Sequence, residues 1–151
     1  MAPATETAMS DAEIDAFLGR NETGVLSLAR EDEPYSIPVS YGYDATARTV
    51  YLRLVSAPDS RKRAFLDTDP AATLVVYDED DADETTYRSV VAAGTLAEVD
   101  PDSLSVEQIQ QYGETRRPLF EIWGQEKSDL DIRLYELVPT ELTGRQTVLK
   151  R

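Results

Sequence analysis

The sequence contains no cysteine and no histidine among its 151 residues. The absence of cysteine excludes disulfide bonds, thiolate nucleophiles and cysteine-based metal sites, and the absence of histidine removes the commonest general base and metal ligand. Long apolar runs are also missing, since no stretch approaches the roughly 18 residues that a membrane helix needs. The first residues have neither the basic nor the apolar region of a secretory signal. We therefore expect a cytoplasmic protein that does not bind membranes.

Lysine is scarce, and acidic residues outnumber basic ones. The chain has 29 Asp and Glu residues against 15 Lys and Arg residues, which gives a formal net charge of −14. This charge argues against binding to nucleic acid, because like charges repel and only a local basic cluster could overcome the repulsion. An apolar content of 41% argues against disorder. An acidic, lysine-poor chain that folds is typical of a halophilic protein, in which dense salt screens the self-repulsion.

Serines in capping positions predict three short helices. Ser10 and Glu13 have the spacing of a capping box, and they precede an apolar helical face. We expect Gly19 to end this helix and Pro70 to end the second. The predicted helices cover residues 10–19, 60–69 and 105–113.

Alternation of apolar and small or polar residues predicts six strands, most clearly between Tyr35 and Tyr43. The predicted strands cover residues 23–30, 35–43, 49–55, 72–78, 87–99 and 132–138. Short connections between most of them indicate antiparallel pairing. The pattern predicts a mainly β fold, a six-stranded closed barrel with short helices at its ends. We expect one domain over residues 10–151, after a flexible tail over residues 1–9.

The most informative cluster is Ser60, Arg61, Lys62 and Arg63. Three cations in the first turn of a helix are destabilising, because the positive end of the helix dipole repels them. A bound anion would reverse this effect, and backbone N–H groups, a hydroxyl and Arg and Lys donors together suit a phosphate monoester. The alternative is a solvated basic turn that balances nearby acids.

Small residues on one face of the 35–43 strand leave space beside the backbone. These residues are Ser36, Pro38, Ser40 and Gly42. A flat ring that hydrogen-bonds to main-chain groups needs such space. The alternative is a strand face packed beneath a helix.

Three further features carry two interpretations each. The acidic segment 78–84 lacks the glycine and terminal glutamate of a calcium loop, so we expect a solvated face and no metal. Trp123, the single tryptophan, suits either the core or the wall of a cofactor site or dimer interface. Arg116 and Arg117 suit either an anionic substrate or surface pairs with neighbouring acids.

The chain resembles the pyridoxamine 5'-phosphate oxidase family of FMN-binding split β-barrels in four segments. They read EPYSIPVSYGYD, TVYLRL, SRKRAFLDTDPAATLVVYD and YRSVVAAGTLAEV. The most specific part is SRK followed by a short helix, a proline and an apolar strand. The resemblance covers residues 14–99 best and weakens after them. It implies an antiparallel split barrel of Greek-key type and a homodimer with flavin at the subunit interface.

The resemblance also implies which residues bind the cofactor FMN. Arg61 and Lys62, with Ser60 beside them, correspond to the family's phosphate-binding residues. The residues implied to contact the rest of the flavin are Ile37, Pro38, Val39, Ser40, Leu52, Arg53 and Ser89. We expect Trp123 to lie beside the pocket. The missing histidine argues against oxidation of pyridoxamine phosphate, for which the family uses an Arg and His pattern near the C-terminus.

These residues predict an FMN-binding flavoprotein that acts as an oxidoreductase. A flavin supplies redox chemistry that a chain without His and Cys lacks. Two alternatives stay open. One is a reductase that uses the deazaflavin F420, whose long anionic tail needs an extended basic groove. The other is a flavin-binding sensor without turnover, because binding residues are visible in the sequence and substrate residues are not.

Overall fold

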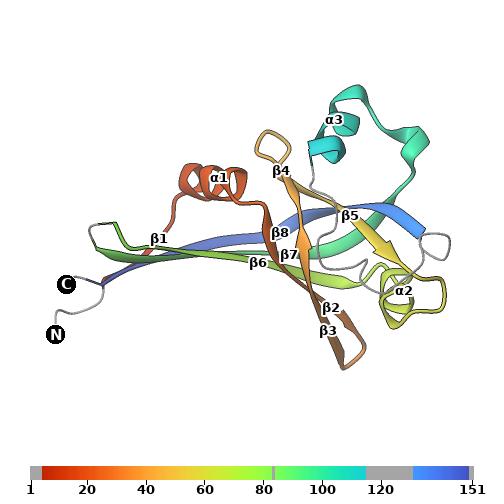
Figure 1. Cartoon of the computed structure of the whole chain (residues 1–151), viewed down its shortest axis with the longest axis horizontal. Helices are drawn as coiled ribbons and strands as arrows, with labels where there is room; N and C mark the ends of the chain where they lie inside the picture. Colours follow the sequence, from red (N-terminus) through yellow and green to blue (C-terminus); the bar gives the residue numbers. More distant parts are fainter. Residues whose placement is uncertain (1–4, 83, 115–130, 150–151) are drawn as a thin grey trace.

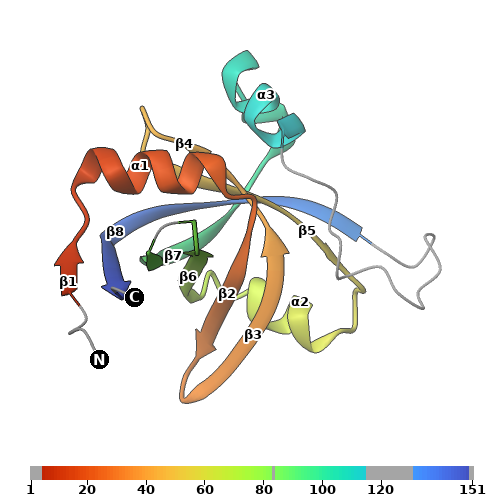
Figure 2. The same ribbon diagram turned by 60° about the vertical axis from the view of Figure 1, so that its left-hand side comes forward.

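The computed structural model describes residues 5–82, 84–114 and 131–149. In this part of the chain, eight strands form one antiparallel sheet with helices at its ends and on one side (Figures 1 and 2). The strands are β1 (Thr5–Ala8), β2 (Thr23–Arg30), β3 (Glu33–Ser40), β4 (Gly42–Asp44), β5 (Thr49–Ser56), β6 (Ala71–Asp80), β7 (Thr85–Val99) and β8 (Asp131–Leu149). The helices are α1 (Asp11–Arg20), α2 (Arg61–Leu66), α3 (Val106–Glu114) and the 3-10 turn η1 (Pro101–Ser103). None of the described helices is both long and apolar enough to span a bilayer.

The sheet is open, with the strand order β3-β2-β6-β7-β8-β5-β4 and β1 beside β8. The mainly β antiparallel prediction is confirmed, whereas the closed six-stranded barrel is replaced by an open eight-stranded sheet. One added strand arises because Tyr41 interrupts the predicted 35–43 strand. The Tyr41 N–H donates to the Glu22 carbonyl at 3.0 Å, and its hydroxyl donates to the Leu18 carbonyl at 2.8 Å. The segment is thereby divided into β3 and β4.

The other added strand lies in the predicted tail. Residues 5–8 form β1, which pairs with the end of β8 from Thr5 opposite Val148 to Ala8 opposite Arg145. The Met9 N–H continues the pairing by donating to the Gly144 carbonyl at 2.9 Å. Residues 5–9 are therefore part of the domain and not a loose tail.

Strand β8 is much longer than the predicted strand 132–138. It pairs with β5 and β1 along one side and with β7 along the other. Proline normally ends a strand because it lacks an N–H, but Pro139 lies at a bulge, where Thr140 is the extra residue and Gly94 is opposite. The bulge lets β8 continue to Leu149. Figure 1 shows β6, β7 and β8 extending together away from α2.

The predicted helices are confirmed, with small changes at their ends. In α1 the Ser10 hydroxyl accepts from the Glu13 N–H at 3.2 Å, and the Ser10 N–H donates to the Glu13 carboxylate at 3.0 Å. The helix passes Gly19 and ends at Arg20, where the Asn21 N–H donates to the Phe17 carbonyl. Phe17 is fully buried with the leucines of β2, β5, β6 and β7, and this core holds the sheet and α1 together.

Candidate functional site

The candidate site begins at Ser60, the N-cap of α2. The Ser60 hydroxyl accepts from the Arg63 N–H at 3.1 Å and donates to the Ala57 carbonyl at 2.7 Å. The hydroxyl thus satisfies one of the backbone donors at the helix start, as capping serines do. This local geometry confirms the predicted cap and fixes where the three following cations leave the backbone.

The three cations point into different surroundings. Arg63 is buried, and its guanidinium donates to the Ser56 hydroxyl at 2.8 and 3.0 Å and to the Asp131 carboxylate at 3.2 Å. The Lys62 ammonium is half-buried and donates to the Val55 carbonyl at 2.9 Å. Arg61 remains at the surface, with 58% of its side chain exposed. Arg63 therefore fastens α2 to the sheet, whereas Arg61 faces outward.

Arg61 lies against an aromatic pair and a carboxylate. Its guanidinium is 5.3 Å from the ring centre of Tyr35 and 5.6 Å from that of Phe65, and the two rings stack with centres 5.3 Å apart. Its Nη2 is 2.8 Å from Oε1 of Glu33. This hydrogen bond, more than the charges of Arg61 and Arg30, holds the pKa of the Glu33 carboxyl below its ordinary value. Figure 2 shows α2 beside β3, the strand that contains Glu33 and Tyr35.

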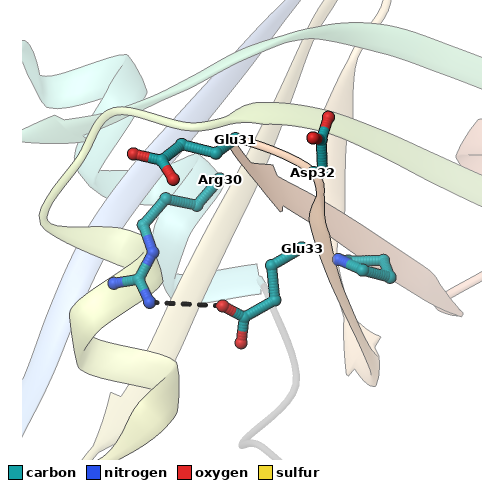
Figure 3. Close-up of a pocket in the computed structure, with 5 residues that line it drawn as sticks. Arg30, Glu31, Asp32 and Glu33 are labelled. Atoms are coloured by element: carbon teal, nitrogen blue, oxygen red, sulfur yellow. Dashed lines mark ion pairs between the residues drawn. The ribbon is translucent and has the colours of Figure 1, made fainter.

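A second arginine that the sequence analysis did not single out approaches the same carboxylate. Arg30 Nη2 is 3.5 Å from Glu33 Oε2, and the Arg30 guanidinium is 4.7 Å from the ring centre of Phe65. The tip of the β2–β3 hairpin forms an open hollow of about 730 Å³, lined by Arg30, Glu31, Asp32, Glu33 and Pro34. In Figure 3, Arg30 and Glu33 point toward one another and Asp32 points away.

The structure places the predicted ring-contact residues on β3 and β5. Val39, Ser40 and Leu52 are buried as whole residues, so within this chain neither their side chains nor their backbones are open to a ligand. Ile37 is half-buried and Pro38 is exposed. Among the described strands β3 pairs with β2 alone, and an edge strand presents backbone N–H and C=O groups outward. The free edge of β3, next to Arg61, is therefore the surface on which a ring could bind to main-chain groups.

Two strands, β2 and β6, separate Ser89 of β7 from this edge. Ser89 is opposite Tyr77 of β6 and Arg145 of β8, nine residues before Glu98 of β7. Glu98 shares a cross-strand row with Leu52 through Tyr135, so about 30 Å along β7 separates Ser89 from the row of Leu52. Val91, two residues after Ser89, shares a row with Pro38 of β3. Three other predicted site residues, Trp123, Arg116 and Arg117, lie outside the described residues.

One face of the sheet near the site carries no charge. Residues that are opposite one another on neighbouring strands share a face, and three such rows cross β3, β2, β6 and β7. The uncharged face consists of Pro38, Val25, Val75 and Val91, then Ser36, Ser27, Thr73 and Ala93, then Pro34, Ala29, Ala71 and Thr95. None of these residues is charged, although 29% of the whole chain is. The face also contains a hollow of about 470 Å³.

The same fold occurs in solved structures of low sequence identity. A protein described as FAD-binding from Mesorhizobium loti is 17% identical, with a TM-score of 0.70 and coverage of 96% of this chain and 98% of that chain. A protein described as FAD-binding from Mycobacterium smegmatis is 16% identical, with a TM-score of 0.66 and coverage of 95% and 99%. A candidate pyridoxamine 5'-phosphate oxidase from Corynebacterium glutamicum is 20% identical, with a TM-score of 0.68 and coverage of 100% and 98%.

A family model described as pyridoxamine 5'-phosphate oxidase matches residues 10–146. The chain therefore belongs to the pyridoxamine 5'-phosphate oxidase family, and the resemblance stated from its sequence is confirmed at that level. No curated protein matches the sequence.

Proposed function

We propose that this protein binds FMN and acts as an FMN-dependent oxidoreductase. The observation that carries the proposal is the exposed guanidinium of Arg61, which already holds an anionic group, the Glu33 carboxylate, at 2.8 Å beside the free edge of β3. A guanidinium with this geometry can hold a phosphate oxygen in the same way. The proteins described as FAD-binding that share the fold support a flavin as the ligand.

The residues around Arg61 fit a flavin monophosphate. Lys62 would add a second cation by rotating its flexible side chain away from the Val55 carbonyl. The Ser60 hydroxyl maintains the cap and so positions both cations. Of residues 37–40, Ile37 and Pro38 are open to the ring, and Arg53 on β5 offers a charged donor. Bound FMN would supply hydride and electron transfer, and the chain would orient it and exclude water.

The proposed active form is a homodimer with the flavin at the subunit interface. The uncharged face supports this assembly, because an unpaired surface without charge is unusual in a chain with a net charge of −14.

Flavin titration followed by absorbance and fluorescence tests the proposal. We expect FMN to bind more tightly than riboflavin, FAD or F420, because the phosphate monoester matches Arg61. Arg61→Gln should weaken FMN binding by about 10- to 100-fold, the effect of one charge-assisted hydrogen bond, and leave riboflavin binding unchanged. Arg48→Gln is the matched control, since Arg48 is a surface arginine paired with Asp11 and Asp15 on α1.

The same titration separates the alternatives. Equal affinity for FMN and riboflavin in the wild type, or no flavin binding, would contradict the proposal. Tighter binding of F420 than of FMN would favour the deazaflavin reductase. Reduction of the FMN-loaded protein by NADH or NADPH, followed by reoxidation, would establish turnover. FMN binding without reduction by either donor would favour the flavin-binding sensor.

A further inference from the structure

The tip of the β2–β3 hairpin places an arginine and a glutamate opposite one another. Arg30 is the last residue of β2 and Glu33 the first of β3, and they form the terminal pair of the hairpin register. The turn between them passes through Glu31, whose φ is 55°. The backbone thus holds both side chains on the same side of the hairpin, above α2.

The Glu33 carboxylate joins two guanidiniums. Its Oε1 is 2.8 Å from Arg61 and its Oε2 is 3.5 Å from Arg30. Each oxygen thus faces a different arginine, which is how a phosphate group bridges two arginines as well. The two arginines come from segments that are about 30 residues apart in sequence, and Glu33 is the group that they share.

A buried aromatic ring supports both guanidiniums. Phe65 is fully buried, and its ring centre is 4.7 Å from the Arg30 guanidinium and 5.6 Å from that of Arg61. Tyr35 stacks on Phe65 and contacts Arg61 at 5.3 Å. Cation–π contacts of this kind hold a guanidinium in place after its carboxylate partner leaves. The spacing of the two arginines is therefore set by the aromatic pair as well as by Glu33.

A phosphate can displace the Glu33 carboxylate from the two arginines, because the phosphate carries more negative charge and the ion pairs that Glu33 loses are weak. A phosphate monoester carries about −1.5 to −2 charges near neutral pH and three acceptor oxygens, against one charge and two oxygens for the carboxylate. The Glu33 side chain is 46% exposed, and exposed ion pairs contribute little to stability. A displaced Glu33 can turn into solvent, since the hollow beside it is open.

We propose that Arg30 and Arg61 form a two-arginine clamp for the phosphate monoester of the flavin, and that Glu33 is the internal counter-ion which this phosphate displaces. This inference rests on the proposed function, because it concerns the same phosphate. It adds a second arginine from the β2–β3 hairpin to the site and assigns Glu33 a competing role. Glu33 then keeps the clamp ordered without ligand and lowers its affinity for weaker anions.

The experiment compares FMN and riboflavin binding in four variants by fluorescence titration. Arg30→Gln should weaken FMN binding by about 10- to 100-fold without changing riboflavin binding. Its control is Arg20→Gln, because Arg20 also lies over a phenylalanine, Phe17 at 5.1 Å, and pairs with a carboxylate, Asp78 at 3.7 Å. Glu33→Gln should tighten FMN binding by about 2- to 5-fold at low salt, with the gain lost at high salt. Its control is Glu31→Gln, which removes the same charge from the same hollow.

Each result bears on the clamp separately from the proposed function. If wild type binds FMN more tightly than riboflavin but Arg30→Gln behaves like Arg20→Gln, the clamp is wrong and the proposed function stands. If Glu33→Gln weakens FMN binding, or tightens it no more than Glu31→Gln does, the competing role of Glu33 is wrong. If wild type binds no flavin, both proposals fail. Thermal unfolding of each variant separates loss of binding from loss of folding.

Discussion

At the scale of single residues, Arg61, Lys62 and Arg63 show how neighbours in sequence come to have different roles. Successive residues of a helix point about 100° apart, so three consecutive side chains cannot share one environment. Arg63 points into the sheet and contacts Ser56 and Asp131, whereas Arg61 points outward to Glu33. Arg63 therefore contributes mainly to stability, whereas Arg61 is available for binding.

We expect Arg63→Gln to lower the free energy of unfolding by about 1–3 kcal/mol, because the change removes the arginine partner of the buried Ser56 hydroxyl and one of the two arginines that donate to the Asp131 carboxylate. Arg61→Gln should change it by less than about 0.5 kcal/mol, as exposed substitutions usually do. Urea denaturation followed by circular dichroism measures both. Equal losses in the two variants would contradict this division of roles.

The sequence predicts Arg61 and Lys62 as site residues because they are adjacent and begin a helix. It does not predict Arg30, because the contact of Arg30 with Glu33 and Phe65 depends on the hairpin register and on the docking of α2. A signal was present in the opposite charges that flank the two-residue turn Glu31–Asp32. Their relation to Arg61, about 30 residues later, is a property of the tertiary structure.

At the scale of elements, the bulge between β7 and β8 determines the course of the longest strand. Gly94 lies at this bulge, opposite Pro139. A Cβ at residue 94 would lie 2.7 Å from the Val138 carbonyl oxygen and 3.1 Å from Leu137 Cδ1. The two strands can approach this closely only because residue 94 has no side chain.

We expect Gly94→Ala to lower the free energy of unfolding by about 1–3 kcal/mol, since the backbone of β8 must shift to admit the methyl group. Gly19→Ala in α1 is the matched control. A Cβ at residue 19 would meet nothing within 4 Å, and alanine favours the helix by about 0.5–1 kcal/mol. Thermal and urea unfolding should therefore show changes of opposite sign. A neutral Gly94→Ala would show that the bulge adapts without strain.

Strong local signals predicted most elements. Strand β2 and all three helices follow from alternation and from capping serines, whose hydrogen bonds are present in α1, α2 and α3. Strand β1 and the second half of β8 were missed because they contain few apolar residues. Thr5–Ala8 is exposed throughout, and its strand conformation depends on pairing with residues about 140 positions later. Pairing of this kind leaves little trace in local sequence.

At the scale of the whole molecule, the uncharged face is the surface that the proposed dimer would bury. We expect Val75→Arg, in the middle of this face, to convert a dimer into a monomer by placing a charge in the buried interface. Sedimentation velocity or light scattering measures the mass. Val106→Arg is the matched control, since Val106 is 73% exposed on α3. A wild-type protein that is monomeric at micromolar concentration would contradict the proposed assembly.

The net charge of −14 has a consequence for the whole molecule as well. Acidic side chains repel one another in the folded state, and salt shortens the range of the repulsion from about 10 Å at 0.1 M to about 3 Å at 1 M. We therefore expect the midpoint of thermal unfolding to rise as potassium chloride is increased over this range. A midpoint that stays constant or falls would indicate that the surface charge does not oppose folding.

One further consequence follows from the place of β8 in the sheet. The strands β3, β2, β6 and β7 form one piece and β5 and β4 another, and in the described part of the chain β8 is the strand that joins them. Because β8 follows both pieces in sequence, a nascent chain that stops before residue 131 holds two unconnected sheet fragments with open edges. We expect productive folding to wait until the ribosome has released residues 131–149, and the exposed edges to require chaperones until then.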